Sequence, residues 1–181
     1  MGEQTKNPET SRASALDGIA SRWAAWLRRT DSLEVVVEIE ALGERVACAN
    51  RVLRRTGLLR RVEWVEGGVP DELVRDAVAL RVSTTRADGA AWTWAFLSIS
   101  ARGEDLTADF DYERRPDLVP PCTRSDCEAE LRLFPRDPVL LPAWMMHLQS
   151  DGIEEVSEAD SRSGEGAGSR RLMGLLALRP R

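Results

Sequence analysis

The chain has 181 residues, of which 43% are hydrophobic and 30% charged, and its formal net charge is -5. This length suits one domain with some tail, and the composition is ordinary for a soluble globular protein. The acidic balance disfavours a surface that binds phosphates throughout. No apolar run approaches the ~20 residues needed to cross a bilayer. We therefore expect a cytoplasmic protein with no nucleic-acid partner and no membrane partner.

Reactive side chains are few. The cysteines, Cys48, Cys122 and Cys127, form an odd and sparse set that does not look like a disulfide framework. Cys122 and Cys127 have no second pair of ligands, which argues against a zinc site. His147 is the only histidine, and no arrangement of Ser, Cys and His suggests a nucleophile with its base. The sequence therefore predicts a protein that is not an enzyme and that holds neither a cofactor nor a metal.

Both ends of the chain are predicted to lie outside one folded domain of residues 13–149. Residues 1–12 are polar and without periodicity, which predicts a disordered lead. Residues 150–181 begin with a stretch rich in Ser, Gly, Glu and Arg, which predicts a flexible tail. Residues 13–30 are predicted to form a helix, because apolar side chains recur at helical spacing at Leu16, Ile19, Ala20, Trp23 and Leu27.

Residues 32–42 (SLEVVVEIEAL) alternate in a way that predicts a strand with one apolar and one acidic face. The apolar face carries Leu33, Val35, Val37 and Ile39. The other face carries Glu34, Val36, Glu38 and Glu40. Gly43-Glu44 predicts a turn, and two further strands are expected at 45–53 and 58–65, joined by a turn at 54–57.

The segment 51–61 is rich in arginine, at Arg51, Arg54, Arg55, Arg60 and Arg61. We expect a solvated sheet edge whose guanidinium groups pair with the glutamates of the 32–42 strand. A nucleic-acid patch is the alternative, and the acidic balance of the whole chain argues against it.

Three more helices are predicted further along the chain. Pro70 suits the first position of a helix over residues 70–85, and the acidic Asp71 and Glu72 suit its first turn. The run Ser125-Asp126-Cys127-Glu128 fits a capping box that opens a helix reaching about Phe134. A last short helix is expected over residues 140–148, with Pro142 near its start.

A β-hairpin is predicted between the first and second of these three helices, with strands at 91–100 and 106–113 around a turn at Arg102-Gly103-Glu104. One face of the first strand carries Thr93, Ala95, Leu97 and Ile99, and the other carries Trp92, Trp94, Phe96 and Ser98. Both faces are largely apolar, which predicts an inner strand covered by helix on at least one side. In the second strand, Leu106, Ala108, Phe110 and Tyr112 share one face.

The opposite face of that second strand carries an acidic row, Asp109, Asp111 and Glu113, and the preceding turn adds Glu104 and Asp105. Neighbouring side chains in such a row stand about 7 Å apart. Three interpretations of this acidic row are open: a solvated sheet face, a surface that binds a basic protein partner, or a metal or acid–base site. An isolated row on one strand is weak evidence for chemistry, so the five carboxylates are treated as candidate partner-binding residues.

The segment 92–145 resembles the YezG-like immunity protein family. The shared features, in order, are an aromatic residue early in an extended segment, a glycine turn, a DFDY run, a short helix, and a proline-containing stretch that leads to a tryptophan. In this chain they are Trp94, Gly103, Asp109-Phe110-Asp111-Tyr112, the helix Glu130–Phe134, Pro135-Arg136-Asp137, Pro142 and Trp144. The chain departs from the family in its arginine-rich segment 51–61 and in its tail after residue 150.

The resemblance implies an α+β fold in which an antiparallel meander packs against helices in a single domain. It also implies a cytosolic antitoxin that neutralises a cognate bacterial toxin, for example a nuclease, by stoichiometric binding. The family brings no catalytic residues. A small regulatory or protein-interaction domain with no toxin partner is the alternative, and the sequence makes no prediction of oligomeric state.

Overall fold

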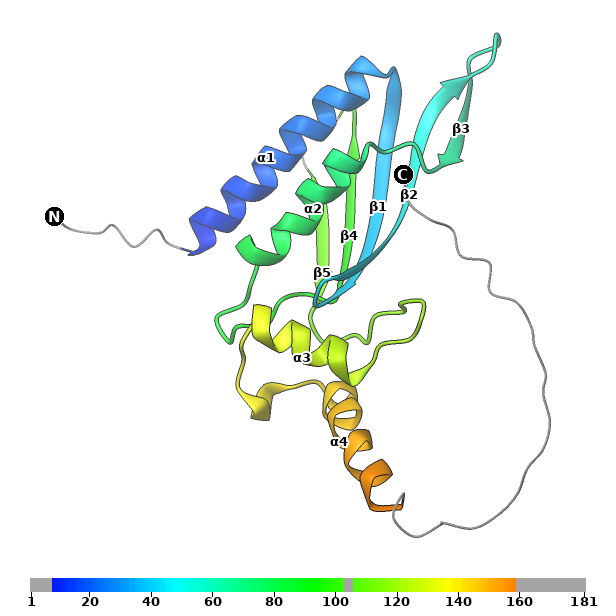
Figure 1. Cartoon of the computed structure of the whole chain (residues 1–181). Coiled ribbons are helices and arrows are strands. Elements are labelled where there is room, and N and C mark those ends of the chain that lie inside the picture. Colours follow the sequence, from blue (N-terminus) through cyan, green and yellow to red (C-terminus); the bar gives the residue numbers. More distant parts are fainter. Residues whose placement is uncertain (1–7, 103–105, 159–181) are drawn as a thin grey trace, which may run out of the picture.

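A computed structural model describes residues 8–102 and 106–158 of the chain (Figure 1). Its elements, in chain order, are α1 (Pro8–Arg29), β1 (Ser32–Leu42), β2 (Arg45–Thr56), β3 (Arg61–Glu66), α2 (Asp71–Ser83), β4 (Trp94–Ser100), β5 (Thr107–Asp111), α3 (Arg124–Leu133), the short 3-10 helix η1 (Pro138–Leu140) and α4 (Ala143–Glu158). The five strands form one antiparallel sheet, which confirms the predicted α+β class. Within the described ranges, no helix is long and apolar enough to cross a membrane.

The sheet has the strand order β3-β2-β1-β4-β5, so β1 lies at its centre. Val37 of β1 pairs with Asn50 of β2 on one side and with Leu97 of β4 on the other. The first three strands form a meander. Helix α2 then connects β3 to β4, which joins the free side of β1. Figure 1 shows α1 and α2 lying together on the same face of the sheet, while α3 and α4 lie beyond one end of the strands.

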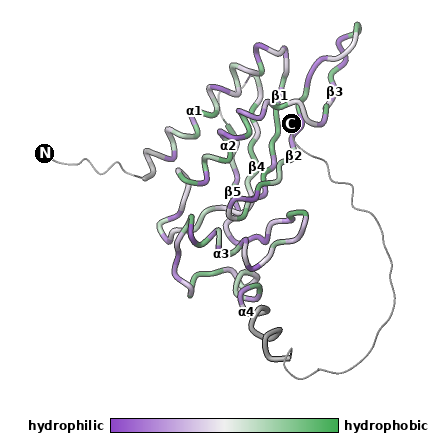
Figure 2. The backbone as a smooth tube through the Cα atoms, in the orientation of Figure 1, coloured by the Kyte–Doolittle hydropathy of each residue, from purple (hydrophilic) through white to green (hydrophobic). Residues whose placement is uncertain are grey.

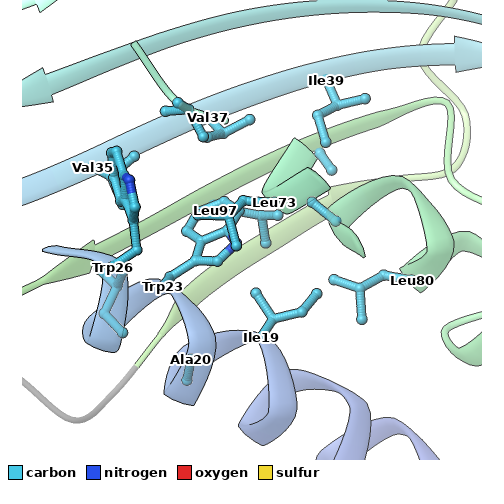
Figure 3. Close-up of a cluster of buried hydrophobic side chains, with 14 of the residues drawn as sticks. Ile19, Ala20, Trp23, Trp26, Val35, Val37, Ile39, Leu73, Leu80 and Leu97 are labelled. Atoms are coloured by element: carbon cyan, nitrogen blue, oxygen red, sulfur yellow. The ribbon is translucent and has the colours of Figure 1, made fainter. Parts of the chain in front are cut away.

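The core lies between α1, α2 and the helix-facing side of the sheet. The predicted bounds of β1 match the structure, and the apolar row Val35, Val37 and Ile39 is completely buried. Figure 3 shows side chains of α1 and α2 converging on those of β1 and β4. Trp92 was expected on the same face as Trp94, but it precedes the strand and is completely buried. Its ring stacks on Phe110 at 5.8 Å between centroids, so it belongs to the core.

A buried ion pair joins the helices at the end of the sheet to the rest of the fold. Nη2 of Arg81, on α2, lies 2.7 and 2.8 Å from the two carboxylate oxygens of Glu130, on α3. The Gly43 N–H donates to the same carboxylate at 2.6 Å, and Arg81 Nε donates to the Trp92 carbonyl at 3.0 Å. Charges this deeply buried persist because each finds several partners.

Both ends of the folded domain extend further than the sequence predicts. Helix α1 begins at Pro8, so residues 8–12 of the expected disordered lead are helical, and Arg12 lies over the Phe110 ring at 5.5 Å. Helix α4 continues to Glu158, nine residues into the expected tail 150–181. Neither stretch was predicted as helix, because its sequence has no apolar stripe. No proline after Pro8 interrupts either helical extension. Residues 1–7 and 159–181 lie outside the described part of the chain.

Several internal boundaries also differ from the prediction. Thr123, rather than Ser125, caps α3, and its side chain and the Asp126 carboxylate exchange hydrogen bonds with each other's backbone N–H groups. Strand β2 continues to Thr56, through the turn predicted at 54–57, because three more residues pair with β3. Pro70 is the N-cap of α2 and lies just outside its first turn.

Candidate binding surface on the open face of the sheet

The face of the sheet that points away from α1 and α2 is formed by alternate residues of the strands, and we call it the open face. Residues directly opposite each other on paired strands project to the same side. The open face therefore carries Glu34, Val36, Glu38 and Glu40 of β1, Ala47, Ala49, Arg51 and Leu53 of β2, Trp64 and Glu66 of β3, Trp94, Phe96 and Ser98 of β4, and Asp109 and Asp111 of β5.

Exposure along β4 confirms that this face is uncovered. Ala95, Leu97 and Ile99 are buried on the helix side, whereas the residues that alternate with them are only half-buried. The same alternation holds for the glutamates of β1. A strand at the centre of the sheet thus has one dry side and one side that water reaches.

Two aromatic rings form a ridge along β4 on the open face. Trp94 and Phe96 stack with 6.5 Å between ring centroids. The Trp94 indole N–H donates to Glu38 Oε1 at 2.6 Å, and the Arg114 guanidinium lies over the Trp94 ring at 5.3 Å. These contacts hold the rings in place before any partner arrives, which lowers the entropy lost on binding.

The glutamates of β1 each have a neighbour on the open face. Glu34 accepts a hydrogen bond from the Ser98 hydroxyl at 3.3 Å. Glu40 accepts from Arg114 at 3.0 Å and from the backbone N–H of Asp117. Arg114 is the guanidinium that partly balances this row, and it is itself 43% exposed at the side chain.

A shallow hollow lies beside the aromatic ridge, where β2 carries small side chains. It has a volume of about 220 Å³ and is lined by Val36, Glu38, Ala49, Asn50, Arg51, Glu66 and Phe96. A second hollow of about 250 Å³ adjoins it and shares Glu38 and Ala49. Alanine at 47 and 49 leaves this space, because larger side chains would fill it. The ridge and the two hollows make the surface of the open face uneven.

The predicted acidic row is divided by the structure. Asp109 is exposed on the open face, beside Phe96 of the neighbouring strand. Asp111 lies on the same face, but its carboxylate accepts hydrogen bonds from the backbone N–H groups of Glu113 and Arg114 at 2.8 and 2.9 Å. Strand β5 ends at Asp111, so Glu113 falls in the following bend and lies 3.8 Å from Arg86. Glu104 and Asp105 fall outside the described residues.

The arginine-rich segment was predicted to pair with the glutamates of the 32–42 strand, and this prediction is wrong. Arg55 and Arg60 both bind Asp31, at 3.0 and 2.5 Å, just before β1 begins. Arg51 lies over the Trp64 ring at 4.8 Å. Arg54 and Arg55 lie on the part of β2 that extends past the level of Glu34, whereas Arg51 lies opposite Val36, between Glu34 and Glu38.

Side chains suited to covalent or metal chemistry do not gather on this face. Across residues 8–102 and 106–158, no three His, Cys, Asp or Glu side chains converge in a way that could hold a metal ion. Cys122 and Cys127 are buried free thiols. Burial, followed by the nearby Cys122 and Asp126, raises the pKa of the Cys127 thiol to about 11, which keeps it protonated at neutral pH.

Sequence reasoning identified Asp109 but missed its surroundings. The acidic face of residues 32–42 was visible as an alternation, and so was the pair Trp94 and Phe96. What brings them together is the strand order, in which β1 and β4 are neighbours although about fifty residues separate them. No alternation within one strand reveals its neighbour.

No family model matches the chain, and no curated protein matches it either.

Proposed function

We propose that this chain is a protein-binding domain that holds a cationic protein partner on the open face of its sheet. One observation carries the proposal: carboxylates of β1 and β5 flank a stacked, pre-positioned pair of aromatic rings, Trp94 and Phe96, on a face that no described helix covers. Aromatic side chains dominate the energetics of many protein interfaces, and charged neighbours select the partner and speed the encounter.

The partner we propose is the toxic domain of a bacterial toxin, so that the chain acts as an immunity protein. The resemblance of segment 92–145 to YezG-like immunity proteins supports this choice. So does the charge of the open face, because a nuclease that binds nucleic acid presents a basic cleft that carboxylates complement. Neutralisation would need only that the bound domain covers the cleft.

The test is the affinity between the full chain and the protein encoded by the adjacent gene, measured by titration calorimetry. Asp109→Lys should weaken binding at least about tenfold, because it places a cation against a cationic partner. Phe96→Ala should cost about 2 kcal/mol or more if the ring is a central anchor. Glu72→Lys is the matched control, since Glu72 is exposed on α2, on the covered side of the sheet.

The possible results separate two claims. Equal affinities for wild type and Asp109→Lys would show that the partner binds elsewhere. Absence of binding by the wild-type chain, together with failure to rescue cells that express the neighbouring protein, would contradict the immunity role. A neighbouring gene that encodes no toxin-like protein would favour a regulatory interaction domain instead.

A further inference from the structure

The β2–β3 hairpin ends in a loop whose residues are unusual for a turn. Residues 57–60 join the paired ends Thr56 and Arg61, and the Arg60 N–H donates to the Gly57 carbonyl at 3.1 Å. Leu58 and Leu59 therefore occupy the two central positions of the turn. Gly, Asn, Asp and Pro favour such positions for conformational reasons, and leucine has none of these advantages.

Both leucines point into solvent. Leu58 is fully exposed and Leu59 is 79% exposed, which makes them the most exposed pair of adjacent large hydrophobic residues in the described chain. Figure 1 shows the hairpin projecting past the ends of α1 and β1, and Figure 2 shows hydrophobic residues at its apex above hydrophilic flanks. Burial in the fold does not account for these side chains, so both are available to a partner outside the fold.

Arginines flank the leucines on both strands, in the run Arg54-Arg55-Thr56-Gly57-Leu58-Leu59-Arg60-Arg61. Asp31 binds two of them, Arg55 and Arg60, and holds them near the base of the loop. Arg54 and Arg61 are exposed. The order from the tip inward is therefore apolar, then cationic.

We propose that the apex of this hairpin binds the surface of an anionic lipid bilayer. The leucines would enter the boundary between headgroups and acyl chains, and the arginines would lie at the level of the lipid phosphates, which is the depth order that surface-binding segments show. The acidic open face does not oppose this contact. Glu34, the glutamate of β1 nearest the tip, pairs with Leu53, and the five residues from Leu53 to Leu58 span about 17 Å at 3.3 Å per residue, whereas the Debye length is about 8 Å at physiological salt.

A bilayer fits this tip better than a nucleic acid does. Proteins that wedge side chains between bases hold the flanking phosphates with many cations. Here two of the four arginines share Asp31, so the tip offers few cations for such phosphate contacts. Two adjacent exposed leucines at an apex suit a fluid apolar layer. This contact is distinct from a membrane span, but it departs from the expectation drawn from the sequence that the chain has no membrane partner.

The proposal is tested by co-sedimentation of the full chain with vesicles of equal parts phosphatidylcholine and phosphatidylglycerol. The wild type should bind these vesicles reversibly, bind less as salt rises, and remain in solution with phosphatidylcholine alone. The double variant Leu58→Ser with Leu59→Ser should lower the partition constant at least about tenfold. Arg54→Gln with Arg61→Gln should weaken binding and flatten its salt dependence.

The matched control is Val119→Ser with Val139→Ser, which removes two valines that are 92% and 85% exposed outside the hairpin. It should bind vesicles as the wild type does. Because all the substituted side chains are exposed, circular dichroism melts should show that every variant folds. Equal binding by the leucine variant and the wild type, equal loss in the valine control, or binding to duplex DNA in place of vesicles would each overturn the proposal.

Discussion

Arg81 and Glu130 form a doubly hydrogen-bonded ion pair whose side chains are 5% and 0% exposed. The pair joins α2 to α3, and Gly43 adds the β1–β2 turn through its N–H and carbonyl groups. The Arg81 guanidinium also lies over the Phe134 ring at 4.8 Å. The segment between β5 and α3 is therefore fixed at both ends, and this segment delivers Arg114 to Trp94 on the open face.

Removing the carboxylate of this pair should destabilise the fold strongly. Glu130→Ala leaves a buried guanidinium and the Gly43 N–H without their acceptor, and the expected loss is about 3–5 kcal/mol. Glu128→Ala, which removes the exposed partner of Arg124 on the same helix, should lose at most about 1 kcal/mol. Urea unfolding measures both. Similar losses for the two variants would show that the buried pair contributes no more than a surface pair.

Two glycines should respond to alanine with opposite signs. Gly89 has a φ of +84°, and an added Cβ would lie 2.1 Å from the Pro135 carbonyl oxygen, so Gly89→Ala should cost about 2 kcal/mol or more. Gly18 lies inside α1 with no atom within 4 Å of an added Cβ, so Gly18→Ala should stabilise the protein by about 1 kcal/mol. Thermal melts report both changes. A melting temperature that rises in Gly89→Ala would refute the close approach of the two loops.

The sequence predicts the strands of this fold better than it predicts contacts between distant segments. The alternation of residues 32–42 was enough to place both ends of β1, because apolar residues recur on one face and glutamates predominate on the other. Nothing local in the sequence marks Glu130 and Arg81 as a buried pair, since their pairing depends on where α3 docks. Nothing local in the sequence shows that Pro135 passes beside Gly89.

Helix α3 should lose stability in acid through its cap. Partial burial acts to raise the pKa of the Asp126 carboxyl, but hydrogen bonds from Thr123 and the Arg45 guanidinium outweigh it and hold that pKa below the usual 3.8. The ionised carboxylate therefore stabilises the fold fully above pH 3.8, and this contribution is lost as the pH falls through the lowered pKa.

Asp126→Asn removes that dependence, because an amide does not titrate in this range. The variant should be less stable than the wild type at neutral pH, and the difference between them should shrink as the pH falls below 3.8, the usual pKa of this carboxyl group. Urea unfolding at a series of pH values gives the comparison. A difference that stays constant across the series would mean that the Asp126 charge does not stabilise the folded state.

The sequence predicted single residues of the candidate site but not how the strands bring them together. Asp109 was placed correctly on an exposed face, because the apolar residues of its strand fix the other side. Asp111 and Glu113 were expected to continue the row, but the backbone bends after Asp111 and uses that carboxylate to form the bend. The aromatic ridge joins the acidic residues only through strand pairing, which a single sequence does not display.

The most direct test of the open face as the binding surface uses the indole N–H signals of the six tryptophans in nuclear magnetic resonance spectra. The neighbouring gene's product is titrated into the labelled full chain. Trp64 and Trp94 lie on the open face, whereas Trp23 and Trp92 are completely buried in the core and Trp144 lies on α4. Signals of Trp64 and Trp94 should shift or broaden first, and the buried pair should stay unchanged. Changes confined to Trp144, with Trp64 and Trp94 unaffected in a bound complex, would contradict the proposal.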